Sequence, residues 1–210
     1  MKTADRILVT SLTLFNEEGE SNVTSVDIAN ELDISPGNLY YHYRGKEEIL
    51  AALLELFESR LRRSLSSPLE LLESYSDYWA FICLLLSDVH EFRFLFRNPL
   101  ELGQKYVKAS RALKRQLKMI EQTLLRMLDQ LGQRGQLILE GKQRALLARQ
   151  AALLISQWSN FDQLVAQTQS SDEVIRQGGL AVMQLVSPFL SPEAKVMFEL
   201  DQAQAKECQP

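Results

Sequence analysis

Hydrophobic residues recur every three or four positions through most of the chain, with polar residues between them. This spacing is typical of an α-helix with one buried face, and alternating strand-like runs are absent. A polar tail closes the chain. The pattern predicts an all-α fold with helices at residues 3–18, 46–63, 68–87, 89–96, 100–133, 142–168 and 172–189.

The clearest interruption of this pattern is the segment SLSSP at residues 64–68. We place a domain boundary there, which predicts a small N-terminal domain at residues 1–64 and a larger helical bundle at residues 65–210. With 210 residues, of which 46% are hydrophobic, the chain is long enough for each domain to bury a core of its own.

Residues 24–46 encode two short helices joined by a tight turn. Thr24 and Asp27 form a capping pattern for the first helix, and Ser35 followed by Pro36 is a start signal for the second. Asp33 lies at the turn, where its side chain tolerates left-handed backbone better than most residues. The pattern is that of a helix-turn-helix, which reads DNA by placing its second helix in the major groove.

The second helix has more polar and aromatic residues than its core contacts require. Only Leu39 and Tyr43 need to face inward, at a four-residue spacing. Taken alone, each tyrosine is about as often a core residue as an exposed contact residue. Consecutive aromatic residues on one short helix, however, cannot all point inward. The free helix N-terminus favours phosphate or base contacts, as does the lysine at the start of the next helix. The predicted DNA-binding residues are Thr24, Ser25, Ser35, Pro36, Gly37, Asn38, Tyr40, Tyr41, His42 and Lys46.

The run SPGNLYYHYRGKEEIL at residues 35–50 is specific, and it follows hydrophobic and capping residues at the expected distances, among them Ile7, Phe15, Gly19, Thr24 and Ala29. With these residues, positions 3–58 resemble the DNA-binding domain of the TetR family of bacterial one-component regulators. The resemblance implies a homodimer with a ligand cavity in its second domain. After residue 58 the resemblance is much weaker, since helical architecture more than any motif defines that domain.

The overall charge differs from that of a nonspecific DNA-binding protein. The formal net charge is -4 and the pI is about 5.4. The window 34–46 nevertheless contains His42, Arg44 and Lys46 and no carboxylate. We therefore expect modest affinity for random DNA, with specific binding that depends on a dimer docking on a palindromic operator.

The last two long helices are predicted to form the dimer interface. Hydrophobic residues cover several faces of residues 142–168, and Gly178 and Gly179 lie in the middle of the second helix, at a cost of about 1 kcal/mol each relative to alanine. Close approach of another helix would offset that cost, although an ordinary intramolecular core is the alternative. The predicted interface residues are Leu147, Ala151, Leu154, Trp158, Ile175, Gly178, Val182 and Leu185.

A ligand cavity would be lined mainly by aromatic residues of the second domain, which favours a small hydrophobic or amphipathic effector of unknown identity. The alternative is that these residues form an ordinary core, which is the commoner role of aromatic residues at helical spacing. The predicted lining residues are Tyr75, Tyr78, Trp79, Ile82, Cys83, Leu86, Phe92, Phe94, Phe96, Trp158 and Phe161, with Arg93 or His90 as a polar anchor.

Catalysis is not expected from this sequence. It holds two histidines and no Gly-rich phosphate loop, metal-binding motif or Cys–His pairing, so we expect no catalytic residue, cofactor or metal ion. No run of 18 uncharged apolar residues occurs, which argues against membrane insertion. Cys83 and Cys208 lack a redox spacing, and we expect reduced thiols in a cytoplasmic protein.

Two functions fit these patterns. The first is a homodimeric transcriptional repressor, released from its operator when an effector binds. The second is an all-helical protein-interaction module in which the helix-turn-helix is purely structural. They differ in whether the chain selects a palindromic DNA site.

Overall fold

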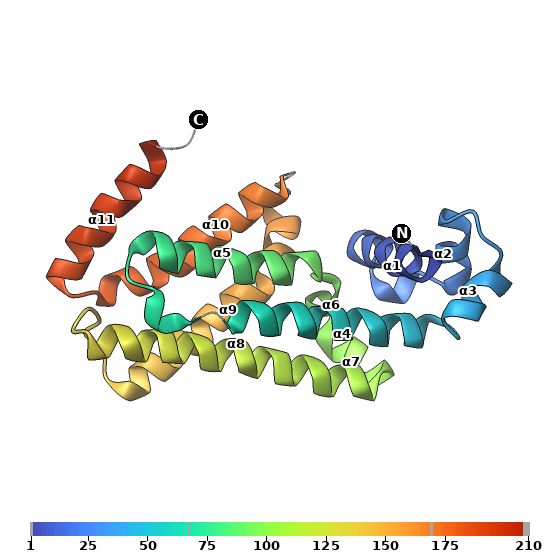
Figure 1. Cartoon of the computed structure of the whole chain (residues 1–210), viewed down its shortest axis with the longest axis horizontal. Coiled ribbons are helices and arrows are strands. Elements are labelled where there is room, and N and C mark those ends of the chain that lie inside the picture. Colours follow the sequence, from blue (N-terminus) through green and yellow to red (C-terminus); the bar gives the residue numbers. More distant parts are fainter. Residues whose placement is uncertain (1, 67, 169, 208–210) are drawn as a thin grey trace. The chain divides into compact units, whose positions relative to one another are not determined.

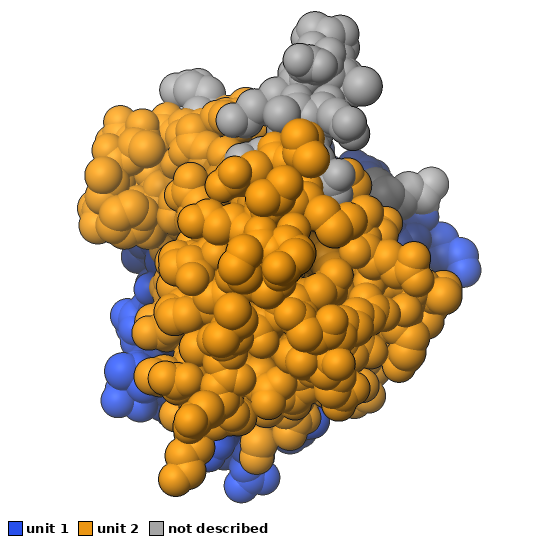
Figure 2. Space-filling model, turned by 90° about the vertical axis from the view of Figure 1, so that its left-hand side faces the viewer, with its two compact units in different colours: residues 1–60, 92–116 blue, residues 61–91, 117–210 orange. Residues whose placement is uncertain are grey.

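The computed structural model describes residues 2–66, 68–168 and 170–207. In this part of the chain the regular elements are helices, so the predicted all-α fold is confirmed (Figure 1). The chain forms two compact units, coloured separately in Figure 2: Met1–Arg60 with Phe92–Gln116, and Leu61–Glu91 with Leu117–Pro210. Ser67, in the predicted boundary, and Cys208 lie outside the described residues.

The first unit opens with the predicted three-helix arrangement. Its elements are α1 (Thr3–Glu18), the short 3-10 helix η1 (Glu20–Asn22), α2 (Ser25–Glu31), α3 (Pro36–His42) and the greater part of α4 (Lys46–Leu65). These helices enclose a core of fully buried side chains, among them Ile7, Phe15, Ile28, Ala29, Leu39 and Leu50.

The helix-turn-helix forms through the local signals that the sequence carries. The Thr24 hydroxyl accepts a hydrogen bond from the Asp27 N–H at 3.2 Å, and the Asp27 carboxylate accepts one from the Thr24 N–H at 2.8 Å. Ser35 Oγ accepts from the Asn38 N–H at 3.2 Å and so caps α3. Asp33 has a φ of 54°, as expected for the left-handed residue of the turn.

Residues 92–116 also belong to this unit, although they follow the predicted boundary. They form α6 (Phe94–Arg97), α7 (Pro99–Lys105) and the start of α8 (Val107–Gln133). The ring of Phe94 lies 5.3 Å from that of Phe15, and its N–H donates to the Asn16 side chain at 3.1 Å. The functional division between residues 64 and 65 stays a prediction.

The second unit contains α5 (Tyr75–Glu91), α9 (Gly141–Val165), α10 (Ser171–Val186) and α11 (Pro192–Glu207), together with the rest of α8. The short 3-10 helices η2 (Leu69–Leu71) and η3 (Ser187–Phe189) lie between them in the chain. Helix α5 packs against α9, α10 and α11, and α9 packs against α10. None of the described helices combines the length and the apolar character that crossing a membrane requires.

Several predicted helix boundaries were wrong. The helix expected at 68–87 begins at Tyr75 instead, because Ser74 and Asp77 form a cap: Asp77 Oδ2 accepts from the Ser74 N–H at 2.9 Å, and Ser74 Oγ accepts from the Asp77 N–H at 3.1 Å. That helix then continues to Glu91, through the start of the short helix expected at 89–96. The helix expected at 100–133 is interrupted at Tyr106, whose φ of -128° and ψ of 91° are extended.

The sequence predicted a polar tail and no helix after residue 189, whereas α11 occupies Pro192–Glu207. Ser191 and Pro192 repeat the start signal of α3, and Ser191 Oγ accepts from the Ala194 N–H at 3.2 Å. The helix gains a core contact from Phe198, whose ring meets that of Tyr75 edge-on at 4.5 Å.

Candidate functional site

Helix α3 separates an inward face from an outward face. Leu39 is fully buried, whereas the side chains of Tyr40 and Tyr41 are 53% and 84% exposed. Ser35, Pro36, Gly37 and Asn38, at the helix N-terminus, are exposed as well. Two aromatic side chains and the exposed N-terminus of the helix therefore lie together on a surface that can approach a duplex.

The other predicted contact residues are placed less openly. Ser25 and His42 are half-buried, and the His42 ring meets that of Tyr41 at 5.2 Å, edge to face. Thr24 is exposed, but its hydroxyl donates to the Asp27 carboxylate at 2.7 Å. The Thr24 side chain is thus occupied in capping α2 and has little left to offer a phosphate.

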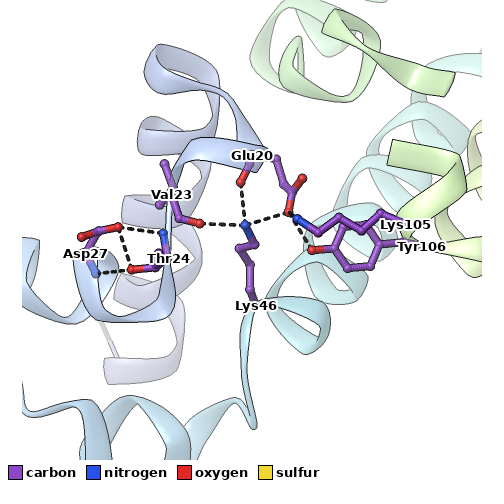
Figure 3. Close-up of polar contacts among 7 residues, drawn as sticks. All are labelled: Glu20, Val23, Thr24, Asp27, Lys46, Lys105 and Tyr106. Carbon is purple, nitrogen blue, oxygen red and sulfur yellow. Dashed lines mark hydrogen bonds and ion pairs between the residues drawn. The ribbon is translucent and has the colours of Figure 1, made fainter. Parts of the chain in front are cut away.

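Lys46 is the one predicted contact whose placement contradicts the expectation of an exposed ammonium. Its Nζ donates to the backbone oxygens of Glu20 and Val23, each at 2.7 Å, and lies 2.9 Å from the Glu20 carboxylate (Figure 3). These three acceptors match the three donors of an ammonium group. A helix N-terminus does favour an anion, but here the anion is the chain's own carboxylate, so Lys46 anchors α4 to η1.

Glu20 is the centre of this cluster, and sequence reasoning missed it. Its side chain is 8% exposed and also accepts a hydrogen bond from the Tyr106 hydroxyl at 2.7 Å and one from Lys105 Nζ at 3.2 Å (Figure 3). No local signal could have indicated the cluster, because Tyr106 lies 86 positions further along the chain.

The charges of the cluster shift two pKa values in opposite directions. Burial alone raises the pKa of Glu20, but the hydrogen bonds from Tyr106 and Lys46 and the charge of Lys46 outweigh burial and leave that pKa below its usual value. Burial and the adjacent Glu20 carboxylate raise the pKa of Tyr106 to about 12. Glu20 therefore stays ionised and Tyr106 stays protonated at neutral pH.

The second unit contains a cavity of about 370 Å³, a volume in the range of small-molecule sites. Helices α5, α8, α10 and α11 supply most of its wall, and α9 contributes Ala151. The wall is largely apolar and rich in flexible methionines. Its side chains include Tyr75, Tyr78, Ile82, Met127, Met183 and Phe198.

Of the residues predicted to line a ligand cavity, Tyr75, Tyr78 and Ile82 lie in this wall. Trp79 and Cys83 pack against Gly179 instead, and burial raises the pKa of the Cys83 thiol to about 11. Trp158 donates from Nε1 to the Val174 carbonyl at 2.9 Å.

Three further predicted lining residues lie outside the cavity wall, for different reasons. Phe161 is 58% exposed on α9, while Phe94 and Arg93 belong to the first unit. Burial lowers the pKa of the half-buried Arg93. Aromatic residues at helical spacing thus proved mostly to be core residues.

The stripe predicted as a dimer interface is largely buried within the chain. Leu147, Ala151, Gly178 and Val182 are buried, and the two helices that carry them, α9 and α10, pack against each other. The other four residues, Leu154, Trp158, Ile175 and Leu185, are partly exposed. The close approach that the glycines permit is therefore intramolecular, because a Cβ at position 178 would lie 2.7 Å from Cδ1 of Trp158.

The opposite face of α9 is apolar and exposed. Leu146, Leu153, Phe161 and Leu164 are 57%, 63%, 58% and 80% exposed. Their separations of seven, eight and three positions place them on one side of the helix. An apolar stripe of this kind marks an interaction surface.

Family comparisons agree with this architecture. A family model described as "Bacterial regulatory proteins, tetR family" matches residues 7–53, and one described as "Bacterial transcriptional repressor" matches residues 56–198. The chain belongs to the TetR family of bacterial transcriptional regulators. The family is one of transcriptional regulators and not of enzymes.

Solved structures of the TetR family share the fold. A TetR-family regulator from Marinobacter aquaeolei VT8 is 26% identical, with a TM-score of 0.85 over 100% of both chains. A TetR regulator from Legionella pneumophila is 16% identical, with a TM-score of 0.67 over 89% of this chain and 98% of its own. At that identity the second likeness concerns the fold alone.

Two curated relatives match over shorter segments. IcaR of Staphylococcus epidermidis, a negative transcriptional regulator of the biofilm operon icaADBC, is 28% identical over 105 residues, which are 50% of this chain and 49% of IcaR. The transcriptional regulator QacR of Staphylococcus aureus is 35% identical over 60 residues, 29% of this chain and 32% of QacR. The chain thus spans about half of one relative and about a third of the other.

Proposed function

We propose that this TetR-family regulator is a cytoplasmic homodimeric repressor that leaves a palindromic operator when a small apolar effector binds. In this proposal residues 1–64 contact DNA, and residues 65–210 bind the effector and form the dimer. A dimer is needed because one helix-turn-helix reads few base pairs, and two recognition helices about 34 to 36 Å apart meet successive turns of the major groove.

The observation that carries the proposal is the outward face of α3. Tyr40, Tyr41 and Asn38 are exposed at and beside the solvent-exposed N-terminus of the helix, while Leu39 fixes the helix to the core. Tyrosine hydroxyls and helix N–H groups position a protein on phosphates, and an asparagine amide can bond an adenine edge. Repression is supported by the family description and by the role of the relative IcaR as a negative transcriptional regulator.

Dimerisation is supported by the exposed α9 stripe of Leu146, Leu153, Phe161 and Leu164 rather than by the buried residues that the sequence favoured. Effector control is supported by the cavity of about 370 Å³. An effector must favour the state that does not bind DNA by about 1.4 kcal/mol for each tenfold loss of operator affinity.

Selection of genomic DNA fragments by the purified full-length protein tests the proposal. We expect one palindromic sequence to be enriched, and we expect Tyr41→Ala and Asn38→Ala each to weaken its binding about 5- to 150-fold in gel-shift titrations, a loss of about 1 to 3 kcal/mol. Leu100→Ala, at a 79% exposed residue of α7, serves as the control and should bind like the wild type. Selection that enriches no sequence would contradict the proposal, and would favour a structural helix-turn-helix in an interaction module.

A further inference from the structure

The polar groups in the wall of the cavity are few, and most of them are already bonded within the chain. The Tyr78 hydroxyl donates to the Leu72 carbonyl at 3.0 Å and lies 3.3 Å from Arg134 Nη1. The Ser74 hydroxyl is used in the cap of α5, where it donates to Asp77 Oδ2 at 2.8 Å. A ligand therefore gains little from either hydroxyl.

Gln136 differs from these groups. Gln136 lines the cavity, and its side-chain Oε1 is buried and has no hydrogen-bond partner among the described residues. Two hydrogen bonds fix the backbone of Gln136. Its main-chain N–H donates to the Leu131 carbonyl at 2.9 Å, and its main-chain carbonyl accepts from the Ser191 N–H at 2.9 Å. A buried acceptor without a donor is costly, so a ligand that supplies an N–H or O–H gains the bond that the chain leaves unmade.

The charge of the wall restricts the ligand further. Among the described residues that line the cavity, Glu73 is the only ionisable group that is charged at neutral pH. Arg134 does not line it, and its guanidinium donates to the Glu70 and Leu72 carbonyls. A ligand carboxylate would lose water, meet no cation and face Glu73, whereas a neutral or positively charged group would not be repelled.

The rest of the wall suits an apolar chain of variable shape. Met127, Met183 and Met197 are unbranched and polarisable, and they adapt to irregular ligands. Tyr75 and Phe198 add aromatic surface, and their edge-to-face contact joins α5 to α11 at the cavity. The apolar wall supplies affinity, while the Gln136 amide selects the head group.

We propose that the cavity takes an apolar molecule ending in a hydroxyl or ammonium group, whose hydrogen is accepted by Gln136 Oε1, and that it rejects carboxylates. The effector role of such a ligand rests on the function proposed above, whereas its binding to the cavity does not. The ligand property that matters is its head group, which must donate a hydrogen bond and carry no negative charge.

Isothermal titration of the full-length protein with four decyl compounds tests the inference. 1-Decanol and decylamine carry a donor, 2-decanone only accepts, and decanoate is an anion. We expect the first two to bind at least about tenfold more tightly than the last two, the difference of one hydrogen bond or one buried charge. Equal affinity for 2-decanone or decanoate overturns the proposal.

Two variants locate the effect. Gln136→Leu should bring 1-decanol within about threefold of 2-decanone, because it removes the acceptor and keeps the volume similar. Ala194→Trp, which fills the cavity from α11, should abolish binding of all four compounds. A wild-type preference that persists in Gln136→Leu overturns the proposal, provided that circular dichroism shows both variants folded.

A gel shift with the selected operator separates this inference from the proposed function. If 1-decanol binds and the operator stays bound, the ligand chemistry stands and the effector role fails. If the protein selects no operator, the proposed function fails and the order of the four affinities is still measured.

Discussion

A single carboxylate holds together three segments of the first unit. Glu20, at the start of η1, meets Lys46 at the start of α4 and Tyr106 between α7 and α8. Removing one partner of a buried ion pair lowers the free energy of unfolding by several kcal/mol. The loss is smaller where one of the side chains is solvated, as Lys105 is at 45% exposure. The start of α4 is thus fixed by charge as well as by packing.

We expect Glu20→Gln to lower the free energy of unfolding by about 1 to 3 kcal/mol at neutral pH, as measured by urea denaturation. The pKa of Glu20 is lowered in the folded state from the ordinary value of 4.5, so its contribution is present above that pH and is lost as the pH falls through the folded pKa. The difference between wild type and variant should therefore shrink below pH 4.5.

Glu55→Gln, at an exposed position of α4, provides the matched control and should change stability by less than about 0.5 kcal/mol. A Glu20→Gln variant as stable as the wild type at neutral pH would show that the cluster does not hold η1 and α4 together.

Two adjacent glycines determine how closely α10 packs. A Cβ at position 178 would lie 2.7 Å from Cδ1 of Trp158, and one at position 179 would lie 3.0 Å from Cys83 Sγ and from Cζ3 of Trp79. Glycine costs about 1 kcal/mol in a helix interior, and here the close contact with α9 and α5 offsets that cost. Gly178 thus permits the close contact of α10 with α9, and Gly179 permits the one with α5.

Gly178→Ala should destabilise the protein despite the better helix propensity of alanine. Overpacking a core costs about 1 to 3 kcal/mol and the gain in propensity is about 1 kcal/mol, so we expect a net loss of about 1 kcal/mol in urea denaturation. In Gly141→Ala the added Cβ meets nothing within 4 Å, and this control should be neutral or stabilising. A Gly178→Ala variant more stable than the wild type would show that the Trp158 side chain shifts at little energetic cost to accommodate the methyl group.

Helix type and capping could be predicted from the sequence because both depend on neighbours three or four positions away. The caps at Thr24 and Ser35 and the left-handed Asp33 are local and were found. The break at Tyr106 was missed, since the hydroxyl bond that accompanies it reaches Glu20 across 86 positions. Local spacing also indicated that Lys46 would meet an anion, but could not tell an internal carboxylate from a phosphate.

At the scale of the whole molecule, the same limit applies to the predicted dimer interface. Periodicity identifies every apolar face of α9 but does not say which of them another helix of the same chain covers. Leu147 and Ala151 are buried within the chain and Ala151 lines the cavity, whereas Leu153 and Leu164 stay exposed. The exposed face is thus the one available to a second copy.

The double variant Leu153→Glu/Leu164→Glu should be monomeric, because four carboxylates would face each other where two α9 helices pair. Sedimentation equilibrium measures the change, and we expect the dimer dissociation constant to rise at least about a hundredfold, roughly 2.7 kcal/mol. Leu100→Glu, at a residue 79% exposed on α7, should leave the mass unchanged. If the double variant is still a dimer, the interface does not lie on this face of α9.

The packing of α10 also makes the unlabelled protein its own optical sensor. The chain has two tryptophans, and Trp158 and Trp79 lie against Gly178 and Gly179 respectively. The Trp79 ring also stacks on Tyr75 in the cavity wall, with 6.1 Å between centroids. Any displacement of α10 alters the surroundings of both indoles at once, so their emission spectrum can follow a titration without an attached dye.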